Sequence, residues 1–490
     1  MSRFVLVLAC AAYAGLTVNS NAAEKPNILF IAIDDMNDWT GFLGGHPQAQ
    51  TPNMDKLARR GVNFTNAHCP APGCSPCRNA LLFGTEPFHS GLYAFYDHAG
   101  FSDKVLRGCT TIPELLQANG YNTYGSGKIH HRREPTPKEW TEFHKPEHHE
   151  LVYKPEEGYQ IGNSRKMAFC PTANPLEEHP DYKVASYGVE VLSRRHEKPF
   201  FLAVGIVKPH LAFVCPQRFF DLYPKDVKPP RINPNDHDDI PAVGRAFAKI
   251  SDDTKFKQDK AWTRVRRAYL ACISWADYNV GRVLDALEAS PYADNTIVVL
   301  WSDHGYGQGE KRHFRKFALW EETTKVPFII WDAREKKAVT GREVQGGVSL
   351  INIYRTLAEL SGIEAPDYVD GFSLVPQLKN PQKPLPKPSI CSWGRGNYTI
   401  RDRDWRYTSY YDGGEELYSH ANDPDEWTNL ANDPAHADVK QRLAAHLPER
   451  EVPIVMEGLE GWSIPVSADK PLGSEPKNKA GNKAKKKGKK

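Results

Sequence analysis

The sequence predicts an α/β protein with a large, mostly parallel central sheet flanked by helices, and a smaller C-terminal α+β subdomain. Nearly continuous apolar runs within 27–33, 198–210 and 295–305 are typical of strands covered on both faces. Segments with helix start and stop signals alternate with these runs, as expected for parallel strands joined by helices. Short segments of alternating polarity follow a proline-rich break at 380–389 and indicate the smaller subdomain.

Helix signals locate the connections between these strands. The first helix is expected within 51–61, a segment that begins with Thr-Pro and ends in Gly. Thr111 and Glu114 have the spacing of a capping box and open a second helix. A strand and loop are expected at 121–131, and the amphipathic segment 266–290 predicts a long helix.

The formal net charge of +3 hides an uneven distribution. Residues 470–490 hold nine Lys and one Glu, and subtracting their +8 from +3 leaves −5 for the rest of the chain. The tail at 469–490 is expected to be a disordered basic arm because it has little apolar surface to bury. This tail could be a simple solvated arm or could bind polyanions, and the sequence leaves both roles open. No nucleic-acid partner is expected.

The N-terminus has the pattern of a signal peptide at 1–22, since Arg3 precedes an apolar run that small residues close near Ala22. This run is too short for a membrane span, and no later run of about 18 apolar residues occurs, so no span is expected. We therefore expect export to the periplasm or the exterior. The exported chain divides into an expected catalytic domain at 24–380 and a C-terminal subdomain at 388–468.

The segment CSPCR contains two cysteines, Cys74 and Cys77, whose spacing fits a redox pair, half of a metal site or a nucleophile. Nine cysteines in 490 residues are too sparse for a dense disulfide framework, and the sequence does not reveal their pairing. A helix beginning near Ser75 would place Cys74 at its N-terminus, where backbone N–H groups favour anions. Arg78 would then return to the same face one turn later.

Acidic residues follow two of the expected strands. Asp34 and Asp35 end the first strand, and Asp303 ends the third. Ligands of open α/β sheets bind beyond the carboxyl ends of the strands. Carboxylates crowded at that edge repel one another unless a cation joins them, and oxygen ligands suit Ca²⁺ or Mg²⁺. The sequence therefore predicts chemistry at this edge.

Together these segments resemble the type I sulfatases of the alkaline phosphatase superfamily. CSPCR is similar to the family's C-x-P-x-R signature, and the resemblance spans 26 to about 435 through PNILFIAIDD, TPNMDKLARRGVNFTNAH, GYNTYGSGKIHH and SDHGYGQGE. FFLAVGIVKPHLAF and SDHGYGQGEKRHFRKFALWEETTKVP are similar to the iduronate-2-sulfatase-like branch. The resemblance implies hydrolysis of sulfate esters, on a sulfated polysaccharide or oligosaccharide, in the alkaline phosphatase/sulfatase-like fold.

The resemblance also implies a modified residue and a metal. A formylglycine-generating maturation enzyme would convert Cys74 to formylglycine (3-oxoalanine), and an oxygen of its hydrate would attack sulfur. The family's metal positions correspond to Asp34, Asp35, Cys74, Asp303 and His304. Ca²⁺ is the expected ion, with Mg²⁺ or another divalent ion as the alternative. Nitrogen is an unusual Ca²⁺ ligand, which leaves a transition metal open.

Further catalytic residues follow from the same resemblance. The family's sulfate-binding positions correspond to Arg78, Lys128, His210 and Lys316. Either His210 or Lys316 is expected to protonate the leaving alcohol, and a lysine among other cations is expected to have a lowered pKa. A histidine after Lys128 is expected to release sulfate. The iduronate-type spacing favours His131, whereas many sulfatases place this histidine at His130.

Three other functions stay open on the sequence alone. A thiol-disulfide oxidoreductase would use Cys74 and Cys77, but it predicts a much smaller thioredoxin-like context. A phosphatase or phosphonate hydrolase of the same superfamily would use the same site on another anion. A non-catalytic glycan-binding relative would use the aromatic residues and the basic tail. Cys77 departs from the family's usual Ser, and no segment identifies the sugar.

Overall fold

The computed structural model describes residues 25–96, 105–131, 135–145, 159–160, 167–335, 342–459 and 464–474. The expected signal segment at 1–22 and the basic tail beyond 474 lie outside these ranges. Within the described part of the chain, every helix is too short or too polar to serve as a membrane span.

The core is an eight-stranded, mostly parallel sheet, as the sequence predicts. Its order is β14-β2-β13-β10-β1-β8-β4-β5. β13 is antiparallel to both of its neighbours, and the other pairs are parallel. In sequence order the strands are β1 (Asn27–Ile33), β2 (Val62–Phe64), β4 (Asn122–Gly127), β5 (Glu142–His144), β8 (Phe200–Ile206), β10 (Thr296–Ser302), β13 (Phe328–Asp332) and β14 (Arg342–Val344).

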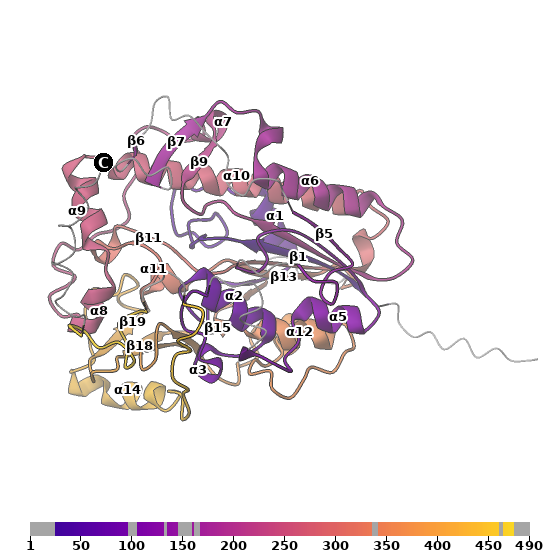
Figure 1. Ribbon diagram of the computed structural model, residues 1–490. Helices are drawn as coiled ribbons and strands as arrows, with labels where there is room; N and C mark the ends of the chain where they lie inside the picture. Colours follow the sequence, from indigo (N-terminus) through magenta and orange to yellow (C-terminus); the bar gives the residue numbers. More distant parts are fainter. Residues whose placement is uncertain are drawn as a thin grey trace, which may run out of the picture.

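Helices cover both faces of this sheet (Figure 1). β1 explains why two layers are needed, because alternate side chains of a strand point to opposite faces and every residue of β1 is buried. Leu29 and Ile31 join the core beneath one group of helices, and Ile28 and Phe30 join the core beneath the other. The first group is α1 (Pro52–Arg60), α6 (Pro180–Ser193) and α10 (Trp262–Glu288); the second is α2 (Cys74–Phe83), α5 (Ile112–Ala118) and α12 (Asn352–Leu360).

The helix predictions agree with the structure to within a few residues. The capping box at the start of α5 is present, since Thr111 Oγ1 accepts from the Glu114 N–H and the Glu114 carboxylate accepts from the Thr111 N–H. Thr51 precedes α1 but makes no capping hydrogen bond; its hydroxyl donates to Asp55 at 2.9 Å instead. α10 starts four residues before the predicted segment, at Trp262.

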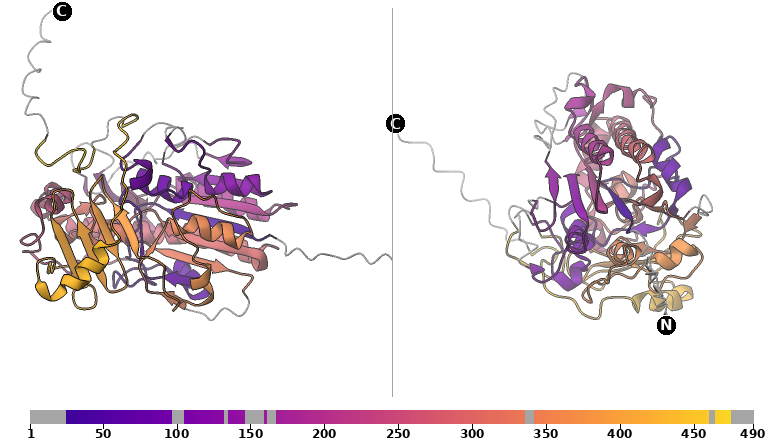
Figure 2. Two further views of the ribbon diagram at one scale, coloured as in Figure 1. Left: turned by 90° about the horizontal axis from the view of Figure 1, so that it is seen from below. Right: turned by 90° about the vertical axis from the view of Figure 1, so that its right-hand side faces the viewer.

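A separate antiparallel sheet follows near the C-terminus and lies at one end of the molecule (Figure 2). Its order is β16 (Ser389–Ser392), β17 (Tyr398–Arg401), β18 (Trp405–Ser409) and β19 (Glu415–Ser419), and α14 (Ala437–Ala444) packs against it. Ile400 and Leu417 of this sheet share a core with Phe83 and Phe88, so the sheet is attached directly beyond α2.

Shorter elements complete the described structure. The small sheets are β3 (Ala67–His68) with β15 (Val348–Ser349), β11 (Gly307–Gln308) with β12 (Phe314–Arg315), and β6 (Tyr159–Gln160) with β7 (Ala168–Thr172) and β9 (Phe213–Pro216). The short helices are α3 (Pro87–Ser90), α7 (Gln217–Phe220), α8 (Ala242–Phe247), α9 (Ile250–Gln258), α11 (Glu321–Thr324) and α13 (Val375–Lys379).

A buried carboxyl between α2 and α3 predicts a pH-dependent stability. Burial and, to a lesser extent, the neighbouring Asp370 raise the pKa of Glu86 to about 8, against the opposing effect of Lys387. The folded chain therefore holds a proton that the unfolded chain releases near pH 4.5, and stability falls as pH rises from there to about 8. The slope for one group is up to about 1.4 kcal/mol per pH unit.

Glu86→Gln removes this titration and is expected to flatten the decline. Urea unfolding midpoints at pH 5, 6, 7 and 8 test it, because the variant should gain stability relative to the parent as pH rises. His89 is paired with Asp370 at 2.9 Å, so His89→Gln is the control for a change beside the same carboxylate. Parallel pH profiles for parent and Glu86→Gln would contradict the assignment.

Candidate active site

The carboxyl ends of four neighbouring strands meet at one edge of the central sheet. β10, β1, β8 and β4 lie side by side in that order and are parallel. Asp303 and His304 follow β10, Asp34 and Asp35 follow β1, Lys128 follows β4, and His210 lies four residues beyond β8. The edge predicted for ligand binding therefore gathers residues that are up to 270 positions apart.

Helix α2 brings Cys74 to this edge as its first residue, one position earlier than expected. The Cys74 side chain is 1% exposed and lies among charged groups. Its Sγ is 2.9 Å from Lys316 Nζ, 3.2 Å from His304 Nε2 and 3.3 Å from Asp34 Oδ1. Burial and Asp34 raise the pKa of the Cys74 thiol far above its usual value. These neighbours are hydrogen-bonding partners suited to oxygen, so the position accommodates a hydroxylated side chain such as hydrated formylglycine.

The predicted metal ligands form a compact buried group. One donor atom from each of Asp34, Cys74, Asp303 and His304 lies within 4.8 Å of every other. Asp35 belongs to the same group, since its Oδ1 is 3.2 Å from His304 Nε2. Three buried carboxylates with one imidazole are a donor set that fits a divalent cation. The residues present therefore fit the expected metal, and their chemistry does not choose between Ca²⁺ and Mg²⁺.

The charges of the described site balance without an ion. The three carboxylates face three cations, Arg78, Lys128 and Lys316. Lys128 Nζ is 2.5 Å from Asp34 Oδ2, and Lys316 Nζ is 2.7 Å from Asp35 Oδ1. A bound divalent cation would give the site a net positive charge, which suits an anionic ester.

These pairings correct one expectation about the lysine chemistry. Lys316 was expected to have a lowered pKa because other cations lie nearby. Burial does act in that direction, but Asp35, Cys74 and Asp34 outweigh it and hold the pKa of Lys316 well above its usual value. Burial alone would raise the pKa of Asp34, whereas Lys128, His210 and other cations bring it well below the usual range.

Arg78 connects the cluster to the surrounding backbone. Its side chain is fully buried, and its Nε donates to Asp303 Oδ2 at 2.8 Å. Its NH1 donates to the carbonyls of Lys128 and Ile129 at 2.6 and 2.9 Å, and its NH2 donates to the Ile33 carbonyl at 3.3 Å. Arg78 therefore ties α2 to the ends of β1, β4 and β10.

The three histidines predicted to act in catalysis occupy different surroundings. His210 is partly exposed, with its Nε2 3.9 Å from Asp35 Oδ2, and desolvation lowers its pKa to about 4 against the pull of Asp35. His130 is buried, and its Nε2 is 2.6 Å from Glu139 Oε1. His131 is less buried and lies edge-on to the Phe95 ring at 5.2 Å.

Three of the seven non-glycine residues with positive φ in the described part of the chain lie at this site. Asp35 has φ of 64°, and the residues on either side of Lys316, Arg315 and Phe317, have φ of 94° and 84°. Non-glycine residues in this region cost about 1–3 kcal/mol each and persist where surrounding contacts fix them. The strained residues are therefore Asp35 and the two neighbours of Lys316, the lysine whose Nζ contacts Asp35.

Sequence reasoning missed two residues that position predicted ones. Asp181, near the start of α6, is buried and accepts the backbone N–H groups of Val207 and Lys208 at 2.8 and 3.0 Å. It thereby fixes the turn that carries His210. Glu139 holds His130 in the same way. Asp181 is an acid in the first turn of a helix and Glu139 is an acid in a turn, and both are too common in such places to indicate these roles from the sequence.

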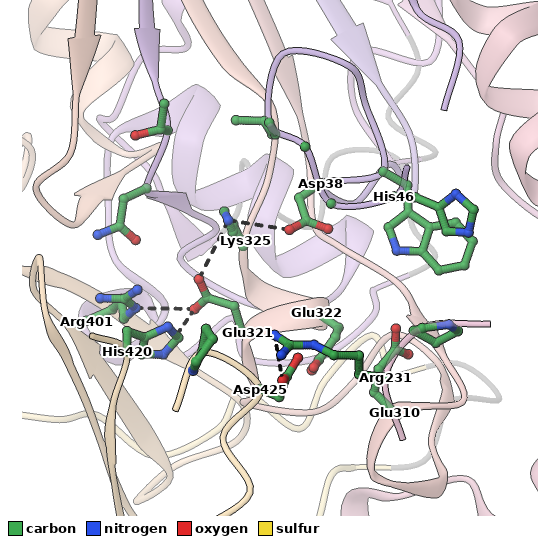
Figure 3. Close-up of a pocket in the computed structure, with 18 of the residues that line it drawn as sticks. Asp38, His46, Arg231, Glu310, Glu321, Glu322, Lys325, Arg401, His420 and Asp425 are labelled. Carbon is green, nitrogen blue, oxygen red and sulfur yellow. Dashed lines mark hydrogen bonds and ion pairs between the residues drawn. The ribbon is translucent and has the colours of Figure 1, made fainter. Parts of the chain in front are cut away.

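A polar pocket of about 770 Å³ lies at the same sheet edge, but the predicted site residues are not among those that line it (Figure 3). Ion pairs join its walls, with Lys325 between Asp38 and Glu321 and with Arg231 on Asp425. Glu321, His420 and Glu426 have metal-like spacing there. Arg406 pairs with both of those glutamates, so the group is an internal ion-pair network.

The fold and the site define a member of the alkaline phosphatase superfamily. A family model for sulfatases matches residues 26–363, and a model for the C-terminal part of N-sulphoglucosamine sulphohydrolase matches residues 309–452. This chain belongs to the sulfatase family, and it is a sulfuric ester hydrolase by class.

Individual relatives agree with this assignment. A sulfatase of Formosa agariphila is 37% identical over 87% of both chains. The human iduronate 2-sulfatase is 26% identical over 90% of this chain and 97% of its own. A solved 2-O GAG sulfatase superposes with a TM-score of 0.66 at 24% identity, covering 86% of this chain and 91% of its own. The last of these supports the fold.

Proposed function

We propose that this protein hydrolyses a sulfate ester on a sulfated polysaccharide or oligosaccharide, with a formylglycine made from Cys74. The observation that carries the proposal is the position of Cys74, whose side chain contacts Lys316, His304 and Asp34 inside the buried cluster. Relatives named as an iduronate 2-sulfatase and a 2-O GAG sulfatase support a carbohydrate substrate.

Two groups would complete the site. Formylglycine supplies a hydrated aldehyde, one hydroxyl of which is the nucleophile toward sulfur. A divalent cation, which we propose to be Ca²⁺, supplies positive charge beside the sulfate oxygens. Asp34, Asp35, Asp303 and His304 would hold this cation, together with the modified residue 74. A maturation enzyme that oxidises Cys74 is therefore a required partner.

The chain's own residues then divide into binding and positioning groups. We assign sulfate binding to Lys128 and Lys316, whose ammonium groups contact Asp34 and Asp35 of the cluster. Arg78 is assigned a positioning role, because its donors already engage Asp303 and backbone carbonyls. His131 is assigned the proton transfer that releases sulfate, since Glu139 holds His130 within the wall.

His210 and Lys316 are the two candidates for protonating the leaving alcohol, and alanine variants separate them. Replacing the residue that donates this proton is expected to lower kcat for a sugar sulfate by about 10²–10⁴-fold. If His210 is the donor, its variant should lose less than about tenfold with nitrophenyl sulfate, whose leaving group needs no proton. Lys316 is also assigned to sulfate binding, so its variant should lose activity on both substrates, and the loss should be larger on the sugar sulfate only if Lys316 donates the proton. Equal losses on both substrates for both variants would contradict acid catalysis by either residue.

The substrate class is tested by sulfate release from a panel of sulfated oligosaccharides, alongside phosphate and phosphonate esters of the same alcohols. The protein should be matured in a host that makes formylglycine. We expect sulfate release from at least one sugar sulfate. Fully modified protein that released phosphate but no sulfate would establish the phosphohydrolase alternative, and binding without turnover would establish a non-catalytic relative.

We also propose that the protein is exported, because residues 1–22 have the pattern of a signal peptide. Export would place the enzyme with polysaccharides outside the cytoplasm. N-terminal sequencing of the protein secreted or released from the periplasm tests this, and the expected mature terminus lies near Ala22 or Ala23. A cytoplasmic protein retaining Met1 would contradict it.

A further inference from the structure

A pair of buried cysteines lies next to the predicted site and takes no part in the mechanism. Cys69 follows β3, and Cys391 belongs to β16 of the C-terminal sheet. Their sulfur atoms are 3.9 Å apart although 322 positions separate them in sequence. The side chains are 0% and 2% exposed, and the structure has both as free thiols.

The backbones around these cysteines lie side by side. The Ser392 N–H donates to the Pro70 carbonyl at 2.9 Å, so the residue after each cysteine is hydrogen bonded to the other segment. The two segments are therefore in direct backbone contact beside the cysteines. Rotation of the two side chains would bring the sulfurs from 3.9 Å to the bonded distance of about 2 Å.

We propose that Cys69 and Cys391 form a structural disulfide in the exported protein. Two S–H bonds break and one S–S bond forms, while the two protons and two electrons pass to an external disulfide, which becomes two thiols. The oxidant is thus a disulfide of the compartment, either a protein disulfide donor or glutathione disulfide. The proposal depends on export for this oxidant and is independent of the proposed sulfatase substrate.

The bond would fix the segment that leads into α2. Residues 70–73 connect Cys69 to the helix that begins with Cys74, so the bond would anchor that helix start to the C-terminal sheet. It would also remove from thiol exchange two cysteines that share a buried core with Cys77. Cys74 and Cys77, the pair that the sequence suggests, are then not the disulfide of this protein.

Peptide mapping tests the proposal without any activity measurement. Protein is recovered from an oxidising compartment, its free thiols are alkylated in denaturant without reductant, and it is digested with trypsin. The peptide 61–78 should be joined to the peptide containing Cys391, with a mass about 2 Da below the sum. Fragment spectra should assign the bond to Cys69. Cys77→Ser should keep the link and Cys69→Ser should abolish it.

A stability measurement provides a second readout. The linked protein is expected to lose on the order of 10 °C in Tm when it is reduced and refolded in reductant. Cys69→Ser and Cys391→Ser should show the same Tm with and without reductant. Alkylation of both cysteines in the recovered protein and also after refolding with glutathione disulfide would overturn the proposal, as would a link to Cys77.

Discussion

Replacing Cys74 with alanine is expected to lower kcat/KM for a sulfate ester by at least about 10³-fold, because it removes the precursor of the nucleophile. The side chain lies within 3.3 Å of Lys316, His304 and Asp34, so the loss should arise at the centre of the cluster. Steady-state kinetics of matured protein with one active sulfate ester measure the effect.

Cys77→Ser is the matched control for this experiment. Cys77 lies in the same helix, is equally buried and belongs to the apolar core beneath it. We expect that variant to stay within about threefold of the parent, since it leaves the cluster unchanged. The peptide over residue 74 should be about 18 Da lighter than the cysteine form in both the parent and Cys77→Ser. Retention of more than a tenth of the activity by Cys74→Ala would refute the assignment.

Asp303→Asn is expected to lower kcat/KM by about 10³-fold and to weaken the binding of the divalent cation. The amide nearly preserves the shape of the carboxylate but removes a buried negative charge. Asp303 Oδ2 accepts from Arg78 at 2.8 Å, and its Oδ1 accepts from the backbone N–H groups of Asp35 and His304 at 3.1 and 3.0 Å. The substitution therefore affects the metal ligands and the helix that carries Cys74.

Asp332→Asn is the control, because Asp332 ends β13 and pairs with Arg334 away from the cluster. Chelator-treated protein is titrated with Ca²⁺ and with Mg²⁺, and recovery of activity gives the apparent affinity. We expect the parent and Asp332→Asn to recover at the same Ca²⁺ concentration, and Asp303→Asn to need at least about tenfold more. Full activity of the chelated parent would contradict a role for a metal.

Much of the catalytic core followed from local patterns. Apolar runs predicted β1, β8 and β10 because strands buried on both faces show no alternation in the sequence. The Thr111–Glu114 capping box was also predicted, since its two hydrogen bonds depend on residues three positions apart. Long-range partners left no such signal, and Glu139 and Asp181 were therefore missed.

The sequence by itself determined the class of fold and the family, and it predicted the residues to which we assign catalytic chemistry, because each motif is a short contiguous pattern. Only the tertiary structure decided how these residues pair. In the folded protein Lys128 pairs with Asp34, Lys316 with Asp35, and Arg78 with Asp303. The pairing with Asp35 helps to raise the pKa of Lys316, which the sequence predicted to be lowered.

The cysteines show the same division. Sequence spacing suggests Cys74 with Cys77, whereas packing places Cys69 against Cys391 from the other end of the chain. The physical reason is that hydrogen bonds, charge pairing and thiol contacts depend on distances of a few ångströms. Strand order and the attachment of the C-terminal sheet set those distances, and neither is encoded in any single segment of the chain.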